Sequence, residues 1–145
     1  MVDESIAIIV QKYLQNLRQH GLPVIFGVVF GSQARGNADP TSDIDLLVIS
    51  QRFDDVRNRA DINLLWRVAA RTDSRIEPIA VGQRQFQTDD SSAIIEIARR
   101  EGQIIPFAEW AWSYLSESLF YAAHVVRAAY ALSLSYKNYS ASNAE

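Results

Sequence analysis

The stretch FGSQARGNADPTSDIDLLV, residues 30–48, places a polar loop with two glycines between two apolar runs. The run before it, VIFGVVF (24–30), is rich in β-branched and aromatic residues and ends at Gly31. The run after it, IDLLVIS (44–50), has the same character. Short apolar runs bounded by turn-forming residues are typical of buried strands. The pattern predicts two core strands joined by a polar loop.

Two aspartates, Asp43 and Asp45, flank Ile44 where the second strand begins. Successive strand side chains alternate between faces, so both carboxylates lie on one face while Ile44 points into the core. Two carboxylates about 6–7 Å apart along a strand repel each other unless a cation lies between them. Oxygen ligands without His or Cys select Mg²⁺ or Mn²⁺. The alternative is a pair of solvated turn acids that follow Thr41-Ser42.

The loop itself does not fit the two common phosphate-binding motifs. GSQARGN (31–37) has the glycine spacing of a P-loop, but Asn37 and Ala38 stand where Lys and Ser or Thr are required. The glycines also lack the G-x-G-x-x-G spacing of a dinucleotide fold. At Gly31-Ser32, glycine lets a ligand approach the backbone, and the following amides and the serine hydroxyl can bind an anion. Ser32 as a helix N-cap is compatible with this role.

A third acid, Glu77, lies in the predicted strand RIEPIAV (75–81). If this strand neighbours residues 44–50, three carboxylates converge beside an anion-binding loop, which is the layout of a two-metal phosphoryl or nucleotidyl transferase. The alternative is an edge-strand acid that pairs with Arg75 or Arg84.

The rest of the chain predicts an α/β (α+β) fold, a small mixed sheet covered mainly on one face by helices. Hydrophobic spacing and turn signals predict helices over 4–19 with Asp3 as N-cap, 55–71 and 91–102, and a small strand at 103–107. Pro78 predicts an edge or an irregular end for the strand at 75–81.

The chain divides into residues 1–106, a single domain, a segment 107–136 that is apolar on nearly every helical face, and a frayed polar tail at 137–145. A helix that is apolar all round packs against something. The segment 107–136 therefore packs on the core of its own domain or docks on a second chain or protomer. Glu117, His124 and Arg127 interrupt it, which argues against a membrane span.

The composition excludes several classes of protein. The 145 residues are 48% hydrophobic and 21% charged with a net charge of −3, so no bulk attraction to nucleic acid is expected. Cysteine is absent, which excludes disulfides, thiolate metal sites and cysteine nucleophiles. The N-terminus carries acids where a signal peptide carries bases, so a cytoplasmic location is predicted.

Gly31-Ser32, then Asp43-Ile44-Asp45, then an isolated acid in a strand together resemble the signature of the polymerase-beta-like nucleotidyltransferase superfamily. The string 31–48 is particularly similar to its minimal, single-domain branch, and the resemblance runs from about residue 24 to 106. It implies a polymerase-beta-type core and transfer of AMP from ATP to a hydroxyl, often a tyrosine of a partner protein. It also implies an antitoxin paired with a HEPN-type toxin.

The resemblance assigns a role to each matching residue. Gly31 and Ser32 would hold the β and γ phosphates of ATP, and Asp43 and Asp45 would ligate two Mg²⁺ ions, with Mn²⁺ as a substitute. Glu77 would complete one metal site and help to deprotonate the attacking hydroxyl.

Arg35 is placed by sequence to meet phosphate charge, and a salt bridge with Asp39 or a neighbouring acid is its structural alternative.

Two other functions stay open on sequence alone. One is a small-molecule nucleotidyltransferase like those that modify aminoglycosides, although the extra substrate domain of those enzymes is missing here. The other is a non-catalytic module that binds a nucleotide, or that docks through residues 107–136 on a partner or a second copy.

Overall fold

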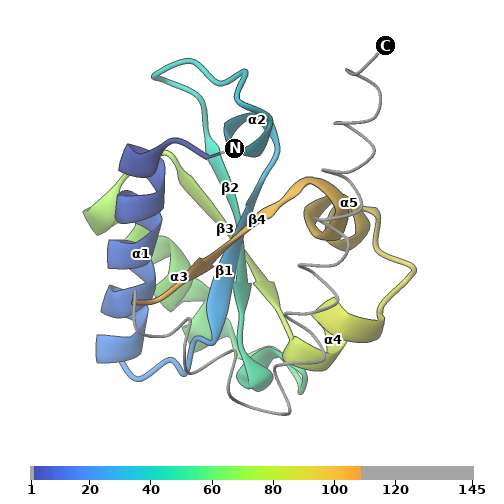
Figure 1. The fold of residues 1–145 in the computed structure, drawn as a ribbon. Coiled ribbons are helices and arrows are strands. Elements are labelled where there is room, and N and C mark those ends of the chain that lie inside the picture. The colour runs from blue at the N-terminus through green and yellow to red at the C-terminus, as the bar shows by residue number, and fades with distance from the viewer. Residues whose placement is uncertain (1, 109–145) are drawn as a thin grey trace.

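The computed structural model describes residues 2–108 and contains a four-stranded mixed sheet with helices on both faces (Figure 1). The elements in chain order are α1 (Glu4–Gln19), β1 (Phe26–Phe30), α2 (Ser32–Arg35), β2 (Ile44–Ile49), the 3₁₀ turn η1 (Gln51–Phe53), α3 (Arg59–Thr72), β3 (Ile76–Val81), α4 (Gln83–Thr88), α5 (Ala93–Glu101) and β4 (Gln103–Pro106). The α/β class and the four predicted strands are confirmed. The segment 109–136 and the tail at 137–145 lie outside the described residues.

The strand order is β3-β2-β1-β4, and the directions are mixed. β1 pairs antiparallel with both β2 and β4, whereas β2 and β3 run parallel. β3 is an edge strand, as Pro78 predicts, because a proline cannot donate to a second neighbour. The parallel pairing means that β2 and β3 begin at the same end of the sheet, where Asp45 lies opposite Glu77.

Helices cover both faces of the sheet, so the expectation of cover mainly on one face is wrong (Figure 1). On one face, α1 and α3 pack over residues such as Val29, Leu46 and Val48. On the other, α4 and α5 supply Phe86, Ile95 and Ala98, which pack over side chains including Val28, Leu47 and Ile49. The strand residues alternate between the two clusters, and both faces are apolar because both are buried.

Local capping fixes the helix boundaries. Asp3 caps α1 by accepting from the Ser5 amide at 2.8 Å, as expected from sequence. The predicted helix 55–71 begins only at Arg59, because the Asn58 side chain accepts from the Ala60 amide at 2.8 Å. Val56, before this cap, is 95% exposed and belongs to no apolar face. Ser92 caps α5, which confirms the predicted helix start.

The short helix α4 was not expected from sequence. Its six residues, QRQFQT, contain one large apolar side chain, Phe86, and carry no helical periodicity. Phe86 packs edge-on against Phe26 of β1, with ring centroids 5.7 Å apart. The helix is therefore held by a tertiary contact and by its cap.

Within residues 2–108, no helix is long and apolar enough to cross a membrane. Phe107 and Ala108, the last described residues, are buried in the core on the α1 side of the sheet.

Candidate active site

The candidate site lies where β1 ends and where β2 and β3 begin. Asp45 is opposite Phe30 in the antiparallel pair and opposite Glu77 in the parallel pair. Asp45 therefore lies between the end of β1, which leads into Gly31, and the third acid. The expectation that β3 neighbours β2 and places Glu77 next to the aspartates is confirmed by this register.

All three carboxylates belong to one face of the sheet. Ile44 is fully buried in the core on the α1 side, so Asp43 and Asp45 on either side of it face the α5 side. Glu77 alternates with Ile76 and Pro78, which are both buried, and shares that face. Asp43 and Glu77 are exposed and Asp45 is partly buried. For Asp45 the alternative of a solvated turn acid is wrong, because Asp45 is a partly buried and paired strand residue, whereas Asp43 is exposed and precedes β2.

The electrostatics show that the three acids act on one another. The negative charge of Asp43 is the largest cause that raises the pKa of Glu77, followed by desolvation, the charge of Asp45 and a hydrogen bond to Asp43. Burial and then the charge of Asp43 raise the pKa of Asp45, while Arg35 acts in the opposite direction. Like charges that disfavour ionisation in this way mark a place where a cation would be stabilised.

The donor set fits a hard divalent cation, since it consists of carboxylate oxygens alone. In residues 2–108, however, no three acidic or histidine side chains are already arranged to hold a metal ion. Asp43 and Glu77 are close enough for the charge of Asp43 to raise the pKa of Glu77. A cation bound here would offset the repulsion among the three carboxylates.

Gly31 brings the backbone against the Asp45 carboxylate. Its φ of 72° and ψ of −148° lie in a region that is essentially restricted to glycine. A Cβ at this position would overlap Asp45 Oδ2. Gly31 is therefore required both by the turn at the end of β1 and by the close approach of the acid.

The loop after Gly31 forms the single helical turn α2. Gly31 is the N-cap, so the alternative of Ser32 as N-cap is wrong: Ser32 is the first helical residue. The amides of Ala34 and Arg35 donate to the Gly31 carbonyl at 3.2 and 3.1 Å. Amides in the first turn of a helix have no partner inside the helix, so those of Ser32 and Gln33 can bind an anion beside the acids.

The alternative pairings of Glu77 with arginine are wrong. Arg75 pairs with Asp73, with 2.8 Å between Nη2 and Oδ2, and Arg84 lies 3.9 Å from Asp54.

Arg35 forms a salt bridge with a neighbouring acid, but that acid is Glu101 at the end of α5, at 3.6 Å, and not Asp39. Arg35 is half exposed and also lowers the pKa of Asp45, so its charge acts on the site while it is paired. Sequence reasoning missed Glu101, because residues 35 and 101 meet only through the packing of α5 on the sheet.

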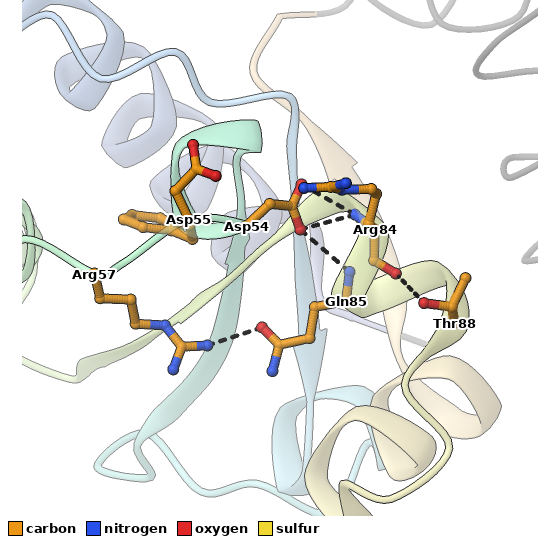
Figure 2. Close-up of a pocket in the computed structure, with 7 residues that line it drawn as sticks. Asp54, Asp55, Arg57, Arg84, Gln85 and Thr88 are labelled. Atoms are coloured by element: carbon orange, nitrogen blue, oxygen red, sulfur yellow. Dashed lines mark hydrogen bonds and ion pairs between the residues drawn. The ribbon is translucent and has the colours of Figure 1, made fainter.

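A hollow of about 490 Å³ at the opposite end of the sheet is a separate feature (Figure 2). Figure 2 shows Asp54 pointing at the start of α4, where it accepts from the amides of Arg84 at 3.0 Å and Gln85 at 3.3 Å. Arg57 donates to Gln85 Oε1 at 2.8 Å. These groups satisfy one another and connect the segment after η1 to α4, so this hollow is structural and the acids at the other end form the candidate site.

Comparison with known proteins identifies the family of the chain. The sequence profile described as a nucleotidyltransferase domain matches residues 10–105, which include all three acids and the Gly31-Ser32 turn. No curated protein is similar enough in sequence to match the chain.

Among solved structures, the chain is similar to one described as a toxin-antitoxin with AMP-PNP. The TM-score is 0.50 and the sequence identity is 16%, and the match covers 91% of this chain and 90% of that chain. Another, described as a putative nucleotidyltransferase from Sulfolobus solfataricus, has a TM-score of 0.45 and 18% identity over 68% of this chain and 80% of that chain. At 16% identity the likeness to the first of these concerns the fold alone. The profile match over most of the chain decides the family, and this chain is a member of the nucleotidyltransferase domain family, with a polymerase-beta-like core.

Proposed function

We propose that this chain is a Mg²⁺-dependent nucleotidyltransferase that transfers AMP from ATP to a hydroxyl of a protein partner. The observation that supports the proposal is the register: Asp45 lies opposite Glu77 and opposite Phe30, the residue before Gly31. Membership of the nucleotidyltransferase family supports transfer of a nucleotide in general.

The chemistry requires a hydroxyl to attack the α phosphate in line while pyrophosphate leaves. Asp43 and Asp45 would hold Mg²⁺, with Glu77 completing one of two sites, and the ions would stabilise charge on the entering and leaving oxygens. The amides after Gly31 and the Ser32 hydroxyl bind the β and γ phosphates, and Arg35 exchanges Glu101 for phosphate oxygens. Glu77 accepts the proton of the attacking hydroxyl.

The proposed partner is a HEPN-type toxin, which this chain would neutralise as an antitoxin in the cytoplasm. Support comes from the similar fold of the structure described as a toxin-antitoxin with AMP-PNP. The proposed docking segment is 107–136, of which only Phe107 and Ala108 are described. Docking of a second copy through the same segment is the other arrangement that the sequence permits.

The test is transfer of label from ATP labelled at the α phosphate, with Mg²⁺ and the protein encoded next to this chain, if there is one. We expect label on the neighbour with the wild type and none with the double variant Asp43→Asn and Asp45→Asn. The matched control replaces Asp55 and Asp90, two exposed aspartates outside the site, by asparagine and removes the same charge. Label that persists in the double variant would exclude the proposed chemistry. Label on an aminoglycoside or similar alcohol without any protein partner would identify a small-molecule enzyme, and nucleotide binding without turnover would identify a binding module.

A further inference from the structure

The loop that leads from α2 into Asp43 is held from two sides. On one side, the buried Gln33 donates from Nε2 to the Ser42 carbonyl at 3.3 Å. On the other, Arg75 donates from Nη1 to the Pro40 carbonyl at 3.1 Å. Within the loop, Asp39 accepts from the Thr41 amide at 2.7 Å. The peptide that carries Asp43 therefore starts from an anchored turn.

Arg75 is itself fixed by Asp73. Its Nε donates to Oδ1 at 3.0 Å and its Nη2 to Oδ2 at 2.8 Å, which is the two-pronged geometry that guanidinium and carboxylate groups favour. The Arg75 amide also donates to Asp73 Oδ1 at 2.9 Å. Both side chains are at least three-quarters buried, with exposed fractions of 25% and 18%. The guanidinium is thus held in one orientation and keeps Nη1 free for the loop.

The same residue begins the pairing of β2 with β3. The Ile44 amide donates to the Arg75 carbonyl at 2.8 Å, one step before the Ile44↔Ile76 and Asp45↔Glu77 pairs. Arg75 therefore binds the chain on both sides of Asp43, at Pro40 through its side chain and at Ile44 through its backbone. No contact of Arg75 with the carboxylates themselves is needed for this.

We infer that Asp73 and Arg75 form a positioning pair that fixes the backbone of Asp43 and Asp45 against Glu77 and so sets the geometry in which the three acids take up a divalent cation. The inference rests on the proposed function, because it assumes that these acids ligate the metal. Groups outside the coordination shell that hydrogen-bond a metal ligand change metal affinity by about 10–100-fold when they are removed, and we use this range for Arg75, which bonds the backbone on both sides of Asp43.

The test measures Mn²⁺ binding to the nucleotide-free full chain by electron paramagnetic resonance, so that it does not depend on turnover. We expect Arg75→Gln to weaken Mn²⁺ binding by about 10–100-fold. Asp73→Asn should have a similar effect, because it releases the guanidinium, and the double variant should be no worse than Arg75→Gln. Arg71→Gln is the matched control: Arg71 is exposed in the last turn of α3 and carries the same charge.

Thermal unfolding of each variant shows whether Mn²⁺ binding is measured on folded protein. If Arg75→Gln does not fold, Mn²⁺ binding to Asp73→Asn tests the inference. Wild-type Mn²⁺ affinity in folded Arg75→Gln or Asp73→Asn would overturn the inference and leave the proposed function intact. An equal loss in Arg71→Gln would also overturn it, since general charge would then be the cause. Failure of the wild type to bind Mn²⁺ at all would refute both the inference and the proposed metal site.

Discussion

Replacement of Gly31 by alanine tests the close approach between the end of β1 and the Asp45 carboxylate. The added Cβ would overlap Asp45 Oδ2, and Asp45 Cγ lies 3.4 Å from the Cβ position. The carboxylate has to move by roughly 1 Å to restore an ordinary contact distance. The Asp45 carboxylate is the end of a flexible side chain and can move. The substitution should therefore disturb the geometry of the candidate site more than the packing of the core.

Two magnitudes follow from this geometry. Alanine at the φ and ψ of Gly31 costs about 1–3 kcal/mol of folding free energy, because this backbone region is essentially restricted to glycine. That loss lowers the melting temperature by roughly 3–10 °C in a domain of this size. A displacement of about 1 Å in a catalytic group costs on the order of 10²-fold in rate. We therefore expect a folded protein with about a hundredth of the nucleotidyl transfer activity and with weakened Mn²⁺ binding.

The matched control is Gly21→Ala. Gly21 also has a positive φ, of 87°, but a Cβ there meets nothing within 4 Å, and it follows α1 at a distance in sequence from the acids. We expect Gly21→Ala to lose stability of the same order, about 1–2 kcal/mol, without loss of Mn²⁺ binding or activity. Thermal melting, Mn²⁺ titration and the labelled-ATP assay provide the three readouts. Wild-type activity in Gly31→Ala, or an equal loss in Gly21→Ala, would refute the reasoning.

Three further predictions concern stability. The pKa of Glu77 is higher in the folded protein than its ordinary value of 4.5, so the folded state loses stability as the pH rises from below 4.5 through the raised pKa. Glu77→Gln should therefore be more stable than the wild type at pH 7 in EDTA, and the difference should be smaller at pH 4. Urea unfolding that shows the opposite trend would contradict this. Asp54→Ala should lower the free energy of unfolding by about 1 kcal/mol, because the first turn of α4 loses the carboxylate that caps it. The Mn²⁺ affinity should not change. A lower Mn²⁺ affinity would connect the hollow of Figure 2 to the candidate site. Tyr13→Phe removes the buried hydroxyl of α1 that donates to the Leu65 carbonyl of α3 at 2.9 Å. Denaturant unfolding should show that the free energy of unfolding falls by about 1 kcal/mol. An unchanged free energy of unfolding would mean that the hydroxyl does not stabilise this helix pair.

Much of the site was predictable because its pattern is local. The alternation of strand side chains places Asp43 and Asp45 on one face whatever the rest of the chain does, and the glycine at 31 marks a turn that other residues cannot adopt. The same local rules predicted α1 with its Asp3 cap and the edge position of β3 from Pro78. These predictions depend on residues within a few positions of each other.

Several of the errors and omissions arise from contacts between distant segments. Helix α4 has no periodicity of its own and depends on Phe26 and Asp54. The cover on the second face of the sheet was missed because a run that is apolar at every position does not show which helices pack on each side. The partners of Arg35 and Arg84 were assigned from nearness in sequence, and these arginines instead pair with residues 66 and 30 positions away.

The sequence by itself therefore determined the ingredients of the site: a glycine turn, two aspartates on one strand face and a third acid on another strand. Only the tertiary structure decided their relation, which is the parallel register that sets Glu77 opposite Asp45 and the Asp73–Arg75 contact with the loop before Asp43. The physical reason is that side-chain alternation follows from the geometry of a single strand, whereas register and ion-pair choice depend on which distant surfaces are buried together.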